Sequence, residues 1–338
     1  MGHPISAATA GVPPTLFLTD ADVALLADWH AAFDALRAAY AGTVSPAMVP
    51  PRTMARGDGL WLRCLSAVSP SGRHMGCKLI SANMKRHCAS YLVSLFDQDS
   101  MALAALIDGN RVTGIRTAAT AVVAIDAAAP ARALRIGVIG SGFEAQGLLS
   151  ALAAVRDIAH VRVFSPTPAS REKFVAMFRD RLNGHIDPAA SARDAVEGAD
   201  VVLCAARSRD ETPVIRGEWL VPGMTVVSIG STLPEQREVD EETIARASLI
   251  VADMPEEVSH DTGDMLAATR AGIAFAERLV PLSDLVSGRV RRGPDDIVLY
   301  KSVGSALQDV ITAEMLLDRA RALHVGTEMA QSIVPVAK

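Results

Sequence analysis

The stretch RIGVIGSGFEAQG, residues 135–147, decides the fold of this chain of 338 residues. It reads as a short buried strand that runs into a glycine turn, and the turn opens the apolar helix FEAQGLLSALAAV. The turn fits G-x-G-x-x-A, in which small residues let the backbone approach a pyrophosphate while the next helix points its first N–H groups at it. The pattern, between strand and helix, therefore predicts a dinucleotide site at Gly140, Ser141, Gly142, Phe143 and Glu144.

The segment VRVFSPTPASREKF, which should end the second strand, bears on which dinucleotide is bound. In NAD-binding turns an acidic residue about 20 positions further on binds the ribose 2′-hydroxyl. This segment has no acid at that place: Ser165 and Thr167 offer neutral donors, and Arg171 can pair with a 2′-phosphate. Arg171 can also be read as a solvated residue in the first turn of the next helix. We expect NADP(H) to be favoured, with NAD(H) as the alternative.

Strands and helices alternate outward from the glycine turn, with further strands expected at 161–164, 201–206, 225–229 and 248–252 and in DIVLYKS. Such alternation indicates a parallel sheet covered on both faces. Before it, the runs LWLRCLSAV, CKLIS, YLVSLFD and LAALID favour an antiparallel sheet, and an amphipathic helix is expected behind an Asp20 N-cap. We expect an α/β protein with a Rossmann-type doubly wound sheet (124–308) inserted in a second, α+β domain (1–123 plus 309–338).

Composition excludes several classes of function. A net charge of −5, with Lys and Arg scattered among acids, disfavours nucleic acid as a partner. Apolar runs such as ATAVVAIDAAAPA fall short of the roughly 20 residues that a spanning helix needs, so no membrane partner is expected. The four cysteines and the histidines show no metal-ligand spacing, and isolated thiols are typical of a cytoplasmic protein.

Several segments together resemble the ornithine cyclodeaminase and mu-crystallin family. They are GCKLIS with Asn83 beyond it, LIDGNRVTGIRTAATA, RIGVIGSGFEAQ, GADVVLCAA, SIGSTLPEQREVD, VADMPEEVSHDTGDM, LSDLVSGRV and LYKSVGSALQD. The likeness runs in order from about residue 45 to 325. It implies hydride chemistry at the α-carbon of an amino or imino acid, and a second domain that binds this small-molecule substrate and forms a homodimer.

By this resemblance the clamp for the substrate carboxylate falls on Arg52, Lys78 and Arg116. A carboxylate beside the reacting carbon must be held in one orientation, which an arginine does with a bidentate fork. Lys78 also interrupts an apolar strand, where a charged side chain is rare unless it has a task.

Asp253 is the candidate general acid/base, because it ends a parallel strand, where ligands of open α/β sheets gather. It could also be only the N-cap of the helix that follows. We assign catalysis to Asp253 and Lys78. The resemblance further implies that four residues flank the cofactor: Thr117, Ala205, Ala206 and Ser302.

One departure from the family bears on the reaction. Ornithine-cyclising members carry a glutamate between the clamp arginine and the clamp lysine, whereas residues 53–77 contain none and offer Arg63 and Cys64 near that place. We therefore expect net NAD(P)H-dependent reduction of a small imino acid, or the reverse dehydrogenation. The alternatives are a lyase that cyclises a diamino acid such as ornithine with recycled NAD, and a non-catalytic cofactor-binding protein of the mu-crystallin kind.

Overall fold

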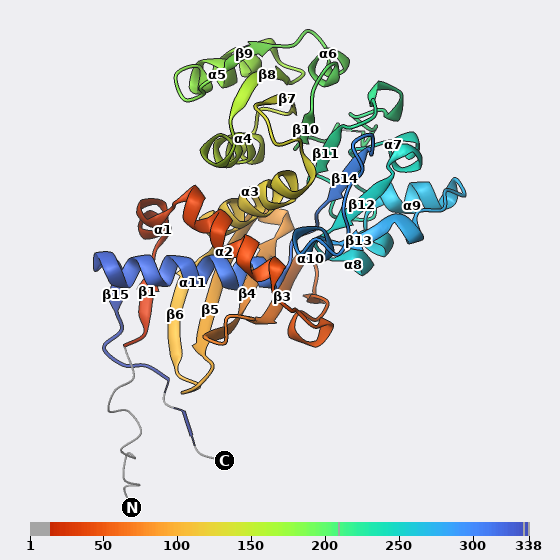
Figure 1. Ribbon diagram of the computed structural model, residues 1–338. Coiled ribbons are helices and arrows are strands. Elements are labelled where there is room, and N and C mark those ends of the chain that lie inside the picture. Colours follow the sequence, from red (N-terminus) through yellow and green to blue (C-terminus); the bar gives the residue numbers. More distant parts are fainter. Residues whose placement is uncertain (1–13, 209, 334, 337–338) are drawn as a thin grey trace, which may run out of the picture. The chain divides into compact units, whose positions relative to one another are not determined.

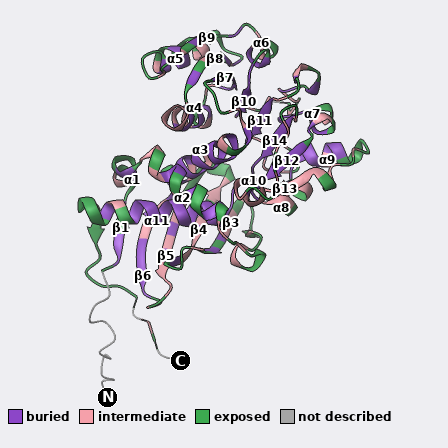
Figure 2. Ribbon diagram, viewed as in Figure 1, coloured by how far each residue is buried: buried purple, intermediate pink, exposed green. Residues whose placement is uncertain are grey.

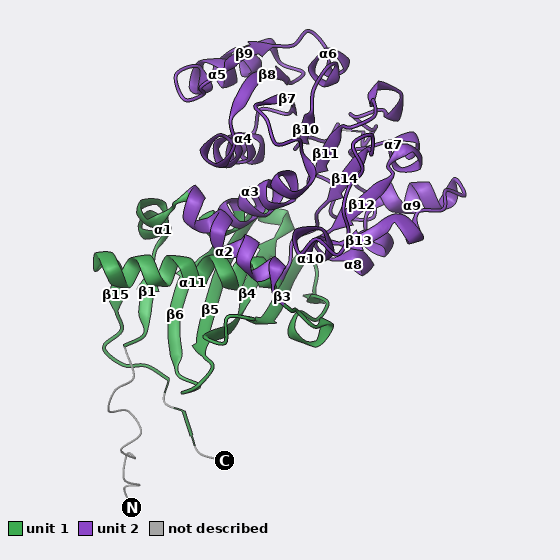
Figure 3. Cartoon of the chain, viewed as in Figure 1, with its two compact units in different colours: residues 1–28, 43–113, 306–338 green, residues 29–42, 114–305 purple. Residues whose placement is uncertain are grey.

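The computed structural model describes residues 14–208, 210–333 and 335–336. The chain forms two compact units, which Figure 3 shows in different colours. Within the described residues, unit 1 contains 14–28, 43–113 and the chain from Ala306 onward, and unit 2 contains Trp29–Gly42 and Gly114–Ser305.

Unit 1 is built on one sheet of order β15-β1-β6-β5-β4-β3-β2, in which β2 to β6 pair antiparallel and β1 runs parallel to β6. Its strands are β1 (Leu16–Leu18), β2 (Thr53–Arg56), β3 (Leu60–Val68), β4 (His74–Asn83), β5 (Cys88–Asp97), β6 (Leu103–Asp108) and β15 (Thr327–Glu328). The antiparallel sheet expected from the four short β-type runs is present, and β3 has the predicted bounds.

Helix α11 (Ala306–Leu323) packs against β3, β4 and β5, and we call the face of the sheet that it covers the inner face (Figure 1). Alternation along β3 explains the packing, because successive side chains point to opposite faces. Leu65 and Ala67 are buried on the inner face, whereas Leu60 and Leu62 are exposed on the opposite, outer face. Figure 2 shows α11 buried along most of its length, as its apolar residues require.

Unit 2 contains a fully parallel sheet of order β13-β12-β14-β11-β10-β7-β8-β9. Its strands are β7 (Leu134–Ile139), β8 (Ile158–Phe164), β9 (His185–Pro188), β10 (Val201–Cys204), β11 (Thr225–Ser228), β12 (Leu249–Ala252), β13 (Leu279–Pro281) and β14 (Val298–Lys301). The Rossmann-type parallel sheet predicted from the strand–helix alternation is confirmed. The edge strands β9 and β13 were not predicted.

Two helices of unit 2 precede its sheet in the chain: α2 (Trp29–Ala41) and α3 (Gly109–Ala128). The helices that connect the strands are α4 (Phe143–Val155), α5 (Pro168–Phe178), α6 (Ala192–Val196), α7 (Glu241–Arg246), α8 (Pro255–Asp261), α9 (Gly263–Arg270) and α10 (Leu282–Val286). Short 3₁₀ helices lie at Pro46–Met48, Met84–Arg86, Gly217–Trp219 and Ala276–Arg278. Apolar side chains of β10, β11, β12 and β14 form the core of the unit.

The N-terminal helix differs from the prediction. Thr19, not Asp20, is the N-cap, since its side chain accepts from Asp22 N in a capping box. The expected single helix is also two: α1 (Asp20–Leu26) packs on β6 and α11 of unit 1, whereas α2 packs on α4 and α10 of unit 2. The apolar stripe continues through both helices, so spacing alone does not reveal the break.

The boundaries of the units also differ from those expected near residues 123 and 308. The change of unit falls inside α3, between Thr113 and Gly114, and again between Ser305 and Ala306. Trp29–Gly42 belongs to unit 2 because α2 packs there.

Candidate active site

The glycine turn follows β7 and opens α4, as expected. Gly140 has φ of 108°, and a Cβ at this position would lie 2.7 Å from the Ala205 carbonyl oxygen, so both conformation and space require glycine. Gly142 is the N-cap of α4, and a Cβ there would meet nothing within 4 Å. Open space therefore lies directly before the N-terminus of α4, where the first backbone N–H groups have no acceptor within the helix.

The residues around the turn leave this space accessible. Ala145 is fully buried in the first turn of α4, which lets the helix pack closely on the sheet. Phe143 is 63% exposed, and its ring occupies the place that a side chain at Gly114 would take. The Ser141 carbonyl oxygen accepts from Gln146 Nε2 at 3.0 Å, which closes the turn. The donor set and the shape fit the pyrophosphate of a dinucleotide.

The end of β8 places the residues expected to choose between NAD and NADP. Ser165 is buried, whereas Thr167 is exposed and is the N-cap of α5 without a side-chain cap bond. Arg171 Nη1 donates to Ala189 O at 2.5 Å, and its guanidinium lies 5.3 Å above the Phe164 ring centre. Arg171 is therefore held in place at the end of β8 and is not merely solvated. Part of its guanidinium is already bound to the backbone oxygen of Ala189.

Asp253 directly follows β12 and is buried. Its Oδ2 accepts from Ser302 Oγ at 2.6 Å and from Gly304 N at 2.8 Å, and its Oδ1 accepts from Val303 N at 3.1 Å. These bonds all come from the segment after β14. Met254, not Asp253, is the N-cap of α8, so the alternative interpretation of Asp253 as that cap is wrong.

Arg116 reaches the same segment from α3. Gly304 has φ of 80°, and a Cβ there would collide with the Arg116 guanidinium, so glycine lets the guanidinium lie against the backbone. Arg116, Asp253 and Ser302 thus converge within unit 2.

Three further residues expected at the cofactor lie in unit 2. Thr117 follows Arg116 on α3 and is half-buried, and Ala205 and Ala206 are half-buried directly after β10. The Ala205 carbonyl is the group that a side chain at Gly140 would meet. Sequence reasoning missed Tyr300 of β14, which is buried and whose phenol pKa is raised well above its usual value by burial and by the nearby Asp253.

Lys78 lies on β4 in unit 1 and is 1% exposed. Its Nζ lies 2.7 Å from Asp309 Oδ1 on α11 and donates to Thr113 Oγ1 at 3.4 Å. Asp309 is fully buried. The sequence singled out Lys78 but missed this partner, although an acid in the apolar stripe of α11 was a usable signal.

The register of β3 on β4 places Arg63 and Cys64 on opposite faces of the sheet. Leu65 lies opposite Lys78, and Arg63 lies two residues before Leu65, so Arg63 shares the inner face with Lys78. Met54 lies opposite Arg63, which places Arg52, two residues earlier, on the same face by alternation. Cys64 points to the outer face. Arg63 stacks 5.2 Å above the Trp61 ring centre.

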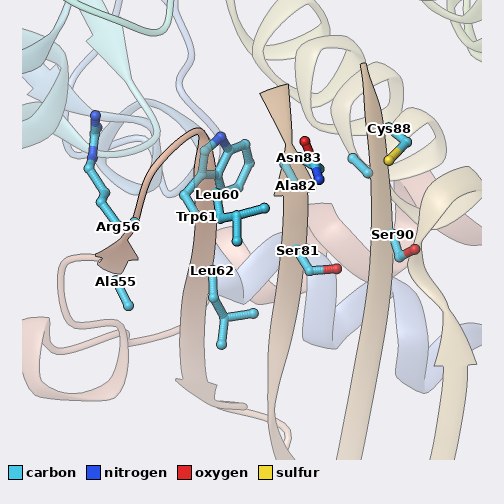
Figure 4. Close-up of a pocket in the computed structure, with 12 residues that line it drawn as sticks. Ala55, Arg56, Leu60, Trp61, Leu62, Ser81, Ala82, Asn83, Cys88 and Ser90 are labelled. Atoms are coloured by element: carbon cyan, nitrogen blue, oxygen red, sulfur yellow. The ribbon is translucent and has the colours of Figure 1, made fainter. Parts of the chain in front are cut away.

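A pocket of about 460 Å³ lies at the hairpin ends of β2, β3, β4 and β5. Figure 4 shows Leu60, Leu62, Ser81 and Ser90 around it, with Arg56 and Trp61 beside them. It contains none of the residues expected to bind cofactor or substrate.

Among the residues that the structure describes, no group of His, Cys, Asp or Glu is arranged to hold a metal ion. Over the same ranges no helix is long and apolar enough to cross a membrane.

Comparison with known proteins identifies relatives of this chain. The profile of the ornithine cyclodeaminase/mu-crystallin family matches residues 15–324. The Delta(1)-pyrroline-2-carboxylate reductase of Bacillus cereus is 28% identical over 290 residues, 85% of either chain. The ketimine reductase mu-crystallin of Mus musculus is 29% identical over 232 residues, 69% of either chain.

Among solved structures, the chain is similar to Thermococcus litoralis Delta(1)-pyrroline-2-carboxylate reductase in complex with NADH and L-proline. The TM-score is 0.83 at 26% identity, and the match covers 93% of this chain and 100% of the other.

Proposed function

Because the chain belongs to the ornithine cyclodeaminase/mu-crystallin family, we propose that it is an NAD(P)H-dependent oxidoreductase that reduces a small imino acid to an amino acid. The observation that carries this proposal is the convergence of Arg116, Asp253 and Ser302 on one buried segment of the unit that holds the glycine turn. The names of the reductases among its relatives support the same reaction.

The reaction adds a hydride to the imine carbon and a proton to the imine nitrogen. A reduced nicotinamide dinucleotide would supply the hydride, with its pyrophosphate held at the turn formed by Gly140, Ser141, Gly142, Phe143 and Glu144. Asp253 transfers the proton, and the hydrogen bonds from Ser302 and Gly304 hold its carboxyl group in one orientation. Arg52, Lys78 and Arg116 bind the substrate carboxylate, and Thr117, Ala205, Ala206 and Ser302 line the cofactor.

Arg63 disfavours the lyase alternative. Cyclisation of a diamino acid requires the pocket to hold a distal ammonium group, which in a buried site needs an anionic partner. Arg63 lies on the inner face with Lys78 and carries the same charge as that ammonium. A substrate with a neutral, short or acidic side chain meets no such repulsion.

A substrate panel tests the reductase proposal against a non-catalytic cofactor-binding protein. The purified protein is mixed with NADPH or NADH and with cyclic imines or 2-oxo acids plus amines, and absorbance at 340 nm is followed. We expect cofactor oxidation that depends on an imine. Tight cofactor binding without turnover of any imine would favour the binding protein.

For the cofactor we propose a preference for NADP(H), with NAD(H) as a weaker ligand. Arg171→Ala should weaken NADPH binding by about 1–3 kcal/mol, the range for a hydrogen bond to a charged group, and leave NADH binding nearly unchanged. Because Ala189 O already binds Arg171 Nη1, we expect the low end of this range. Fluorescence titration of both cofactors measures it, and equal affinities in the parent protein would contradict the preference.

We also propose that the chain forms a homodimer through the outer face of unit 1, where Leu60 is 52% and Leu62 47% exposed beside the 460 Å³ pocket. An open apolar sheet face of this kind is typically covered by association. Leu62→Asp should yield monomers in light scattering at micromolar concentration. Leu25→Asp on α1, where Leu25 is 68% exposed, is the matched control and should leave the dimer intact. A monomeric parent protein would exclude the dimer.

We also propose a cytoplasmic location. The four cysteines are not joined in disulfides, which is compatible with a compartment where thiols are kept reduced.

A further inference from the structure

Unit 2 contains a charged network that is buried completely. Lys301, the last residue of β14, lies 2.8 Å from Asp264 Oδ2, and both side chains are fully buried. Lys301 Nζ also donates to Ser228 Oγ and to Ser231 O, each at 3.0 Å. Asp264 Oδ1 accepts from Glu238 N at 2.8 Å, which brings a second buried acid to the cluster.

Glu238 binds the segments that follow two neighbouring strands. Its Oε1 accepts from Ala206 N at 2.9 Å, beyond the end of β10. Its Oε2 accepts from Ser228 Oγ at 2.6 Å and from Gly230 N at 2.9 Å, at the end of β11. A Cβ at Gly230 would lie 2.5 Å from Oε1, so the close approach depends on glycine.

These segments all lie at the carboxyl edge of the parallel sheet, where β10, β11 and β14 are neighbours (Figure 1). Open α/β sheets bind their ligands at this edge. Ala205, next to Ala206, presents the carbonyl that abuts Gly140 of the glycine turn. Lys301 precedes Ser302, which holds Asp253. The network therefore supports the glycine turn through one segment and the candidate acid/base through another.

Stability alone is a poor account of such a network. Asp264 pairs directly with the ammonium of Lys301, and Glu238 is linked to that ammonium through Ser228 Oγ. Buried ion pairs can often be replaced by apolar residues without loss of stability. Burial and the nearby Asp264 raise the pKa of Glu238, whereas Lys301 and the hydrogen bonds from Ser228 and Gly230 oppose the rise. The carboxylate of Glu238 fixes the orientation of the loops at the edge of the sheet, because it accepts from two backbone N–H groups and one hydroxyl.

We propose that Glu238 is a positioning residue for the dinucleotide site and that Lys301 and Asp264 hold it in place. This inference rests on the proposed function, because it assumes that a nicotinamide dinucleotide binds at the glycine turn. Glu238 itself touches neither substrate nor cofactor. It acts through Ala206 and Gly230.

The test is Glu238→Gln, an amide of the same size. Its nitrogen must face the N–H of either Ala206 or Gly230, so one backbone donor loses its acceptor whichever way the amide turns. We expect the Kd of NADH, measured by fluorescence titration without substrate, to rise about tenfold, as the loss of a charged acceptor implies.

Asp200→Asn is the matched control. Asp200 is buried just before β10, at the opposite end of the strand, and accepts from Arg132 Nη2 at 2.7 Å and from Arg135 N at 2.8 Å. Burial opposes its ionisation, but the bonds from Arg135 and Arg132 lower the pKa of Asp200, so the asparagine should also lower the melting temperature. It should leave the Kd of NADH unchanged.

The outcomes separate the two ideas. A parent protein that does not bind NADH or NADPH would refute the proposed function. A parent that binds, with Glu238→Gln less stable but equal in Kd, would refute the positioning role alone. If Glu238→Gln does not fold, Ser228→Ala decides: it removes one hydrogen bond to Glu238 Oε2, and a rise in Kd of about threefold supports the role. An unchanged Kd would overturn it.

Discussion

Replacing Asp253 by asparagine is expected to lower the turnover number of imine reduction by about 100-fold or more, the scale of a positioned proton-transfer group. The affinity for NADH measured without substrate should stay within about twofold, because the carboxyl group of Asp253 is bonded to Ser302, Val303 and Gly304 and asparagine has the same size. Steady-state kinetics and fluorescence titration on the same preparation measure both quantities.

Ser302→Ala is the control for the local structure around Asp253. It removes the 2.6 Å hydrogen bond from the hydroxyl but keeps the carboxyl group and both backbone donors. We expect a loss of turnover of about tenfold or less, as for one hydrogen bond to a charged group. If Asp253→Asn retains turnover, or if both variants lose it equally, Asp253 is not the proton-transfer group.

Replacing Lys78 by methionine is expected to lower the free energy of unfolding by about 3–5 kcal/mol, because it leaves Asp309 buried without its ammonium partner. Urea unfolding followed by circular dichroism measures this. The specificity constant kcat/KM should fall as well, since Lys78 belongs to the proposed carboxylate clamp.

A double variant separates the two roles of Lys78. Lys78→Met with Asp309→Leu removes both charges, so stability should return to within about 1–2 kcal/mol of the parent protein. Substrate binding should not return, because the cation is still missing. Recovery of kcat/KM together with stability would show that Lys78 has only a structural role.

The fold of unit 2 could be predicted largely from sequence because local signals agree there. The strand before Gly140, the glycine turn and the apolar helix after it support one another, and the later strands repeat the alternation. β9 and β13 were missed because they are short edge strands: His185–Pro188 is polar and Leu279–Pro281 ends in proline. Neither segment carries the apolar run of a central strand.

The candidate site was predictable only in part. The sequence motifs single out Asp253 and Arg116, and the structure brings both side chains to Gly304. The roles assigned to them stay predictions. The partners that fix the charged groups are far away in sequence: Asp309 lies 231 residues after Lys78, and Glu238 reaches Ala206 from 32 residues away. Periodicity can mark Asp309 as a buried acid, but which cation it pairs with depends on tertiary packing, which neither periodicity nor spacing encodes. The same holds for Arg63, whose face follows from the register of β3 on β4.

The most direct test of the central claim, net reduction of an imine, follows NADPH and ammonia in the same cuvette. With a cyclic imino acid such as Δ1-pyrroline-2-carboxylate, we expect one NADPH consumed for each amino acid formed and no ammonia released. With ornithine, we expect neither proline nor ammonia, since Arg63 shares the inner face with Lys78 and would repel a distal ammonium bound there. Proline and ammonia formed from ornithine, with no net change in absorbance at 340 nm, would contradict the account and make the protein a cyclising lyase.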